Sequence, residues 1–330
     1  MSTSSSKHYL PVIALSISSL PMSSENNRKM KVVRYHAFGG PEVLTVDETA
    51  VPHAGPGQIR IVVHCAGVNP SDWKRREGQY ASFEDAKFPL AIGVEASGIV
   101  DEIGDGVSGV AIGDAVFGFG EGTVAEKVIL THWAEKPASV SFEVASGLPV
   151  IVDTATRVLD EVSIETGQTL LVNGAAGGIG TAIVQLARLR GITVIGTASS
   201  PKHDYLASLG AVPVNYGPGL KERICELSPS GVDAAIDVAG SDIIPELISI
   251  VGKPEQVLSI ADLSAEKYGA KFSHGPPRKP EIAFANVARL CDRGLFILHI
   301  QDVYTFEQTA EAHRISAEGR VTGKLVIRIC

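Results

Sequence analysis

Hydrophobic positions near the middle of the chain follow a strand, a glycine cluster and a helix in close succession. Residues 170–172 form a short apolar run that is typical of a buried strand, and apolar residues from Ile183 onward recur along one helix face. Between them, glycines would let the backbone turn tightly and approach a pyrophosphate at the positive end of the helix. The pattern predicts a dinucleotide-binding turn, with a tight turn of an ordinary strand–helix unit as the alternative. Ala175 takes the first position of the usual G-x-G-x-x-G, and Gly177 and Gly180 take the other two. The residues expected to cradle the cofactor are Gly174, Ala175, Ala176, Gly177, Gly178, Ile179 and Gly180.

Strand and helix patterns alternate after this turn. Such alternation predicts a parallel, doubly wound sheet of the α/β class. The segment 268–280 is punctuated by glycine and proline and is expected to be a loop. The expected strands are 193–197, 212–215, 232–238 and 256–261, and the expected helices are 201–209, 220–227, 243–251 and 280–293.

The chain before residue 120 has a different pattern. Short β-forming runs such as 58–66 alternate with frequent glycines, which predicts a compact, β-rich domain that resembles a barrel. From residue 142 the period changes, and 142–148 and 152–162 are expected to be helices. Near the end, 306–318 is expected to be a helix and 323–329 a strand.

The first 29 residues stand apart from this pattern. They are rich in serine and asparagine, and 9–20 is apolar enough to resemble the core of a signal peptide, but only Lys7 precedes it and no A-x-A site follows. We expect a disordered leader. A secretion signal, a tag remnant or a start assigned too early are the alternatives, and Met30 is then the candidate functional start.

Composition narrows the class of protein. The net charge of −8 and the lack of a basic stripe argue against nucleic-acid binding. The four cysteines are scattered without a C-x-x-C pair, so we expect a reducing, cytoplasmic location. No apolar run is long enough to span a membrane.

The end of the second strand of the parallel sheet suggests which nucleotide binds. An NAD site has an acidic residue here to hold the ribose 2′-hydroxyl. This chain instead has Ser199, Ser200 and Lys202, which can donate to a 2′-phosphate and neutralise it. NADPH is therefore the expected cofactor, with a serine-capped helix and a solvated lysine as the alternative.

Several stretches along the chain together form a recognisable set. They are RYHAFGGPEVL at 34–44, AGVNPSDWKRREGQY at 66–80, GVEASG at 93–98, GDAVFGF at 113–119, NGAAGGIGTAIVQLA at 173–187, VNY at 214–216, GVDAAIDVAG at 231–240 and AEAHRISAEGRVTGKLVI at 310–327. With them the chain resembles the zinc-independent quinone oxidoreductase (zeta-crystallin-like) branch of the medium-chain dehydrogenase/reductase superfamily. The resemblance implies a GroES-like β-rich catalytic domain (30–153) into which a Rossmann NADPH-binding domain (154–290) is inserted, with a return to the catalytic domain at 291–330. It also implies a homodimer.

The resemblance also bears on zinc. Zinc alcohol dehydrogenases of this superfamily carry Cys where Asn69 stands and His where Val94 stands. Neither Asn nor Val replaces those ligands, so no metal site is expected. Without a Lewis acid to stabilise an alkoxide, an already electrophilic acceptor is favoured over a simple alcohol.

Roles for individual residues follow from the resemblance. Tyr80 matches a tyrosine that faces nicotinamide and substrate and can donate a proton, although it could instead only pack, with water as the proton source. Asn69 matches an amide near the nicotinamide, or is a turn residue before Pro70. Thr154 matches a cofactor-binding threonine, or is a helix N-cap, and Lys324 matches a lysine near the cofactor, or is a surface charge. The remaining expected cofactor contacts are Tyr216, Ala239, Ser259, Ile260 and Ala261.

These features predict an NADPH-dependent, zinc-free oxidoreductase that transfers hydride to a quinone or an α,β-unsaturated carbonyl compound. Two alternatives remain open at this point. One is a biosynthetic enoyl-thioester reductase, possibly with a carrier-protein partner. The other is an NADPH-binding protein with little turnover, such as a sensor, a lens-type structural protein or an RNA-associating factor.

Overall fold

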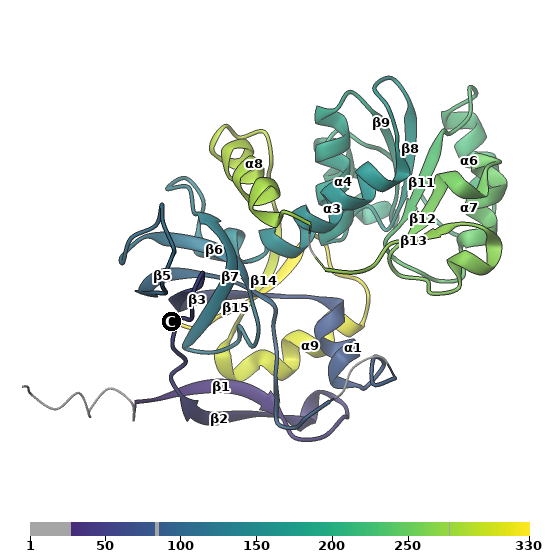
Figure 1. Ribbon diagram of the computed structural model, residues 1–330. Coiled ribbons are helices and arrows are strands. Elements are labelled where there is room, and N and C mark those ends of the chain that lie inside the picture. The colour runs from purple at the N-terminus through teal and green to yellow at the C-terminus, as the bar shows by residue number, and fades with distance from the viewer. Residues whose placement is uncertain (1–27, 83–85, 277) are drawn as a thin grey trace, which may run out of the picture.

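The computed structural model describes residues 28–82, 86–276 and 278–330. It has a β-rich part, formed by the beginning and the end of the chain, and an α/β part formed by the middle (Figure 1). The leader proposed for residues 1–29 lies outside the described residues up to position 27.

The α/β part is built on a 6-stranded parallel sheet with the strand order β10-β9-β8-β11-β12-β13. This is the doubly wound Rossmann order, and the strand order reverses between β8 and β11, where ligands of such sheets bind. The strands are β8 (Thr169–Asn173), β9 (Thr193–Thr197), β10 (Val212–Val214), β11 (Ala234–Asp237), β12 (Val257–Ser259) and β13 (Lys271–Phe272).

Helices cover both faces of this sheet because its strands alternate their apolar side chains between two cores. Leu170 and Val172 pack into the first core, whereas Leu171 between them packs into the second. The first core contains side chains of α3 (Leu148–Val162), α4 (Gly178–Leu189), α5 (His203–Ser208) and α8 (Pro280–Asp292), and the second those of α6 (Leu220–Leu227) and α7 (Ile244–Val251).

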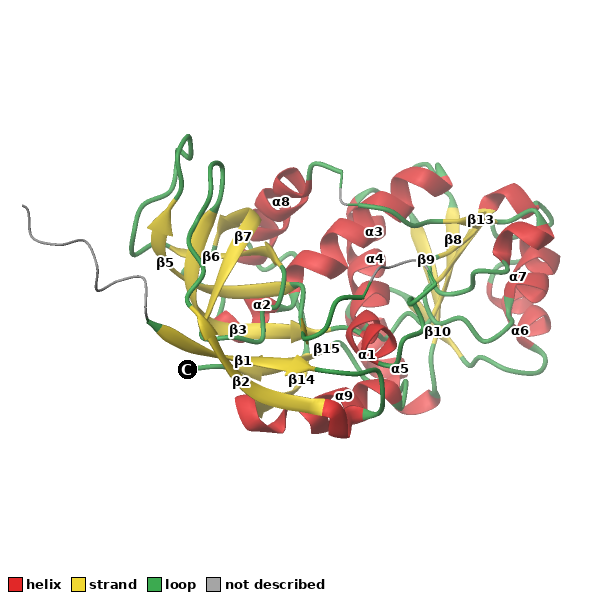
Figure 2. Ribbon diagram, turned by 60° about the horizontal axis from the view of Figure 1, so that its bottom comes forward, coloured by secondary structure: helices red, strands yellow, loops and turns green. Residues whose placement is uncertain are grey.

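The β-rich part contains a second 6-stranded sheet, ordered β14-β15-β3-β5-β6-β7, whose strand β3 also pairs with β7 (Figure 2). That extra pairing curls the sheet around a core that includes Ile59, Ile61 and Leu130. A 3-stranded sheet, β2-β1-β4, lies beside it. The strands are β1 (Lys29–Tyr35), β2 (Leu44–Ala50), β3 (Ile59–Val68), β4 (Leu90–Ala91), β5 (Glu95–Ile103), β6 (Ala115–Gly120), β7 (Lys127–Glu135), β14 (Ile300–Thr305) and β15 (Lys324–Arg328).

The end of the chain joins the two parts. β15 pairs antiparallel with β3, so the chain returns to the β-rich part in which it began, and α9 (Thr309–Ala317) packs against α1 (Pro70–Arg76). Just before β15, the Gly323 amide donates to the Ala176 carbonyl at 2.9 Å, inside the glycine turn. The turn is therefore attached to the β-rich part by main-chain contact.

The predicted architecture is confirmed, with local corrections. β13 lies inside the segment expected to be a loop, and β14 was not predicted, because its sequence IQDVYT lacks a clear apolar alternation. The expected helices 142–148 and 152–162 are α2 (Phe142–Ser146) and a longer α3 that already begins at Leu148, where Pro149 occupies the first turn. Thr154 therefore lies inside α3, and its interpretation as an N-cap is wrong.

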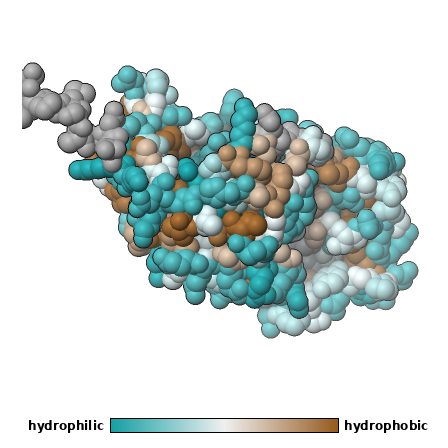
Figure 3. All heavy atoms as spheres, turned by 90° about the horizontal axis from the view of Figure 1, so that it is seen from below, coloured by the Kyte–Doolittle hydropathy of each residue, from teal (hydrophilic) through white to brown (hydrophobic). Residues whose placement is uncertain are grey.

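The surface does not show one dominant apolar patch on the face drawn in Figure 3, which is largely hydrophilic with separate apolar areas. Among the described residues, no helix is long and apolar enough to cross a lipid bilayer.

Candidate active site

The glycine turn follows β8 directly and leads into α4. Gly174 has φ +83°, and Gly177 precedes the first residue of the helix. A Cβ on Gly180 would lie 2.4 Å from the Gly174 carbonyl oxygen and 2.6 Å from Ala175 Cα, so only glycine allows α4 to pack this closely on the turn. The N-terminus of a 12-residue helix thus faces the edge where β8 and β11 diverge.

A buried polar network holds the carboxyl ends of four neighbouring strands together. Asp237 at the end of β11 accepts hydrogen bonds from Asn173 Nδ2 at 2.8 Å and Ser259 Oγ at 2.7 Å. Its Oδ1 also accepts from the backbone amides of Ala239 and Gly240. On the other side, Thr197 Oγ1 donates to Asn173 Oδ1 at 2.8 Å. All four side chains are buried, so the network fixes the loops on which a dinucleotide would lie.

The Ser259 hydroxyl belongs to this network and forms hydrogen bonds only within the protein, among the described residues. Its hydroxyl donates to Asp237 and accepts from the amides of Ala261 and Asp262 at 3.0 and 2.9 Å. Ser259 is fully buried, so its side chain shapes the loop that includes Ile260 and Ala261. Sequence reasoning assigned no role to Asn173, Thr197 or Asp237, although each lies at or next to the end of a predicted strand.

The residues expected to bind the 2′-phosphate lie just after β9 and just after β10. Ser199 precedes a 3₁₀ turn (Ser200–Lys202), and the Ser200 hydroxyl donates to Asn215 Oδ1 at 3.0 Å. Tyr216, the residue after Asn215, is 60% exposed. The Lys202 ammonium donates to the carbonyls of residues 320 and 321 at 2.7 and 3.2 Å, and burial lowers its pKa. An ammonium has three donors, and the described residues account for two of them.

A second buried cluster lies where the β-rich part meets the N-terminus of α3. Asn69, which precedes α1, donates from Nδ2 to Glu95 Oε1 at 2.8 Å and accepts at Oδ1 from Lys324 Nζ at 2.5 Å. Lys324 and Glu95 form an ion pair at 2.7 Å, and Glu95 Oε2 accepts from the Val150 amide at 2.8 Å. Asn69 is 3% exposed, Glu95 0% and Lys324 4%. The interpretation of Lys324 as a surface charge is therefore wrong.

The cluster adjoins the glycine turn. A Cβ on Gly178 would lie 3.6 Å from Lys324 Cδ, so the lysine stem runs past the first residue of α4. The structure therefore brings Asn69 and Lys324, two of the predicted site residues, together beside the turn. It adds Glu95, whose stretch GVEASG was noticed in the sequence without a role for the acid.

Asp72 holds the main chain of Asn69, a member of this cluster. Its carboxylate accepts from the Asn69 backbone amide at 2.7 Å. Burial raises the pKa of Asp72 to about 7, against the opposing effects of that hydrogen bond and of Lys324. The group therefore holds its proton in the folded protein at pH values where the unfolded chain has lost it.

Replacing Asp72 by asparagine tests this shift. Between pH 4 and 7 the folded state binds more protons than the unfolded state, so wild-type stability falls as the pH rises through this window. Asp72→Asn removes the titration and keeps an acceptor for the Asn69 amide. We expect the unfolding midpoint of the variant, relative to wild type, to rise from pH 4 to 7 and then to level off. A difference independent of pH would contradict the raised pKa.

Three other predicted residues lie outside these two groups of hydrogen-bonded side chains. Tyr80 is half-buried in the turn after α1 and lines a small crevice with Phe38, Arg75 and Leu90. Thr154 lies on α3 and is half-buried, and Ala239 is exposed directly after the Asp237 network. Nothing in these contacts tests their roles, which stay predictions.

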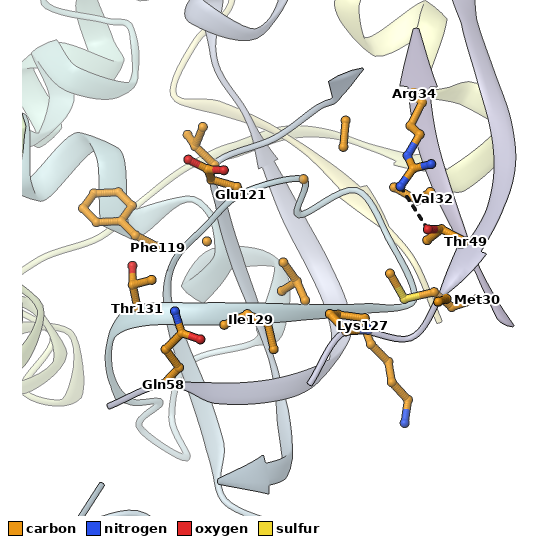
Figure 4. Close-up of a pocket in the computed structure, with 17 residues that line it drawn as sticks. Met30, Val32, Arg34, Thr49, Gln58, Phe119, Glu121, Lys127, Ile129 and Thr131 are labelled. Atoms are coloured by element: carbon orange, nitrogen blue, oxygen red, sulfur yellow. Dashed lines mark hydrogen bonds between the residues drawn. The ribbon is translucent and has the colours of Figure 1, made fainter. Parts of the chain in front are cut away.

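A separate cavity of about 640 Å³ opens in the β-rich part between β1, β2 and β7 (Figure 4). Met30, Val32 and Ile129 give it apolar walls, and Arg34 donates to Thr49 Oγ1 at its rim. None of the residues predicted to bind the cofactor, all of which are described, lines it. Volume alone does not make it the active site, because it lacks contact with the glycine turn.

The residues do not fit a zinc ion. Within residues 28–82, 86–276 and 278–330, no three His, Cys, Asp or Glu side chains are grouped so that they could hold a metal. Asn69, at the position where the zinc enzymes have cysteine, is bonded to a lysine ammonium, which would repel a cation.

Comparisons with known proteins agree with this geometry. Residues 55–136 match the family "Alcohol dehydrogenase GroES-like domain" and residues 214–327 match "Zinc-binding dehydrogenase". Quinone oxidoreductase-like protein 2 of Mus musculus is 31% identical over 314 residues, which cover 87% of this chain and 89% of the mouse protein. This chain belongs to the quinone oxidoreductase-like branch of the medium-chain dehydrogenase/reductase superfamily.

Two further relatives extend the comparison. The NADPH-dependent alkenal/one oxidoreductase of Arabidopsis thaliana chloroplasts is 29% identical over 325 residues, which cover 91% of this chain and 80% of that protein. The structure of the Escherichia coli quinone oxidoreductase complexed with NADPH matches with a TM-score of 0.80 at 23% identity. The match covers 91% of this chain and 100% of the E. coli chain and shows that the two share a fold. The chain is thus related to quinone oxidoreductases and to alkenal/enone reductases.

Proposed function

We propose that this protein is an NADPH-dependent, zinc-free oxidoreductase that transfers hydride to a quinone or to an α,β-unsaturated carbonyl compound. The observation that carries the proposal is the contact between a dinucleotide-type glycine turn and the buried Asn69–Glu95–Lys324 cluster. A cofactor on the turn would extend its nicotinamide toward a polar group that can bind a carbonyl oxygen.

The turn fits a dinucleotide. A Cβ on Gly177 would meet only the Gly174 carbonyl oxygen, at 3.6 Å, so packing within the protein does not explain the glycine, whereas the approach of a pyrophosphate does. Ser199, Ser200, Lys202 and Tyr216 would surround the 2′-phosphate. NADPH supplies the hydride when bound, and the protein positions the two reactants and excludes water.

Tyr80 is proposed as the proton donor to the reduced acceptor. A phenol can donate a proton to an enolate and be reprotonated from solvent. Tyr80→Phe removes the donor and keeps the ring. We expect kcat with an enone to fall roughly 10²-fold while the Kd for NADPH stays within about threefold, as measured by steady-state kinetics and nucleotide fluorescence titration. Unchanged turnover would leave Tyr80 as a packing residue and water as the proton source.

The function itself is tested by the consumption of reduced nicotinamide with NADPH or NADH and with three acceptors: a simple enone, a benzoquinone and an enoyl thioester. We expect NADPH oxidation with the enone or the quinone, and weaker activity with NADH. Tight NADPH binding without consumption would favour the binding-protein alternative. Activity restricted to the thioester would favour the biosynthetic reductase.

A further inference from the structure

The Asn69 side chain is held at both ends by opposite charges. Its Oδ1 accepts from the Lys324 ammonium, and its Nδ2 donates to the Glu95 carboxylate. A flipped amide would place its NH₂ group against the ammonium and its oxygen against the carboxylate, which would be repulsive at both ends. The two charges therefore fix one orientation of the amide.

The charges themselves cannot easily move. Glu95 is completely buried between Lys324 and the amide of Val150, which lies in the first turn of α3. A Cβ on Gly67 would lie 2.4 Å from Glu95 Oε1, so the β3 main chain lies tightly against the carboxylate. The Asn69 main chain is fixed as well, by the hydrogen bond from its amide to Asp72.

One N–H of Asn69 has no partner that the structure shows. Nδ2 carries two hydrogens, and within the described residues Glu95 accounts for one of them. Lys324 bound at Oδ1 draws electron density from the amide and makes the second N–H a stronger donor.

We propose that Glu95 and Lys324 are positioning residues that hold this second N–H ready to donate to the carbonyl oxygen of the hydride acceptor. The proposal rests on the function proposed above. When hydride adds to the β-carbon of an enone or to a quinone, the carbon–carbon π pair shifts and negative charge forms on that oxygen; a proton from Tyr80 or water then completes the reduction. A fixed donor at this oxygen stabilises the charge without reorganising.

A double-mutant cycle tests the link through Asn69. Lys324→Met is expected to lower kcat with an enone by about 10²-fold and to change the Kd for NADPH by less than about threefold. In an Asn69→Ala background, Lys324→Met should lower kcat by less than about twofold further, because the donor that it positions is already gone. Asn69→Ala keeps the backbone amide that binds Asp72. A control, Arg328→Met on the same strand, removes an exposed charge paired with Glu143 and should leave kcat unchanged.

The neutral pair Glu95→Gln/Lys324→Met guards against misfolding, because it removes both buried charges together. We expect this double variant to unfold in a single cooperative transition and to show the same loss of kcat as Lys324→Met. If the loss of kcat caused by Lys324→Met were as large in the Asn69→Ala background as in wild type, the proposal would be overturned. The ion pair would then have only a structural role.

A readout without turnover uses the complex with NADP⁺ and the enone. The side-chain amide NMR signal of Asn69, identified by its absence in Asn69→Ala, should shift when the enone is added to wild type and should not shift in Lys324→Met. An unperturbed wild-type signal would contradict the proposal. If none of the acceptors supports NADPH oxidation by the wild-type protein, the proposed function itself fails. That result is distinct from a failure of the positioning role.

Discussion

Replacing Asp237 by alanine is expected to lower the free energy of unfolding by on the order of 4 kcal/mol and to abolish measurable NADPH binding. The variant removes the acceptor of Asn173 Nδ2, of Ser259 Oγ and of the backbone amides of Ala239 and Gly240. Each buried group left without a partner costs roughly 1–3 kcal/mol, partly recovered where water enters. The loops that it releases come from three strands that form the edge of the proposed nucleotide site.

Asp233 offers a matched control on the same segment. Its carboxylate accepts one hydrogen bond, from the Thr169 amide, at an exposed position. Asp233→Ala should cost less than about 1 kcal/mol and leave NADPH affinity unchanged. Denaturant unfolding and nucleotide titration of the two variants measure both effects. If the two aspartates behaved alike, the buried network would not be what holds the loops.

Gly177→Ala is expected to leave stability unchanged and to weaken NADPH binding at least about tenfold, which corresponds to roughly 1.4 kcal/mol. Gly177 has φ −76° and ψ 173°, which alanine adopts freely, and its Cβ would make one ordinary contact. The added methyl group would instead stand where the pyrophosphate approaches the backbone.

Gly180→Ala is the contrasting variant. Its Cβ would overlap the main chain of Gly174 and Ala175, so we expect a clear loss of thermal stability as well as of affinity. Calorimetry and isothermal titration of both variants separate the two effects. Unchanged affinity in a stable Gly177→Ala protein would place the cofactor elsewhere.

Most of the fold could be predicted from local sequence patterns. The run of β8, the glycine turn and α4 is contiguous, and apolar periodicity placed each of these elements within a few residues of its observed bounds. β14 was missed because its residues Ile300–Thr305 are half polar and gain their place by pairing with β15.

The site was predicted less completely, because its contacts join distant segments. Lys324 and Asn69 are 255 positions apart, and nothing local to TGKLVI shows that its lysine is buried against an amide. Glu95 escaped for the same reason, since a carboxylate at the start of a strand is ordinarily exposed. Lys202 was expected to neutralise a phosphate or to be solvated, whereas two carbonyls of the segment before β15 accept hydrogen bonds from it.

The most direct test of the proposed chemistry follows the hydride. NADPH carrying deuterium at the transferred position of nicotinamide C4 is incubated with the full-length protein and an enone, and the saturated product is analysed by mass spectrometry and NMR. We predict one deuterium at the β-carbon of the product, at a rate that falls in Gly177→Ala. Product without the label, or no product while NADPH stays bound, would contradict hydride transfer by this protein.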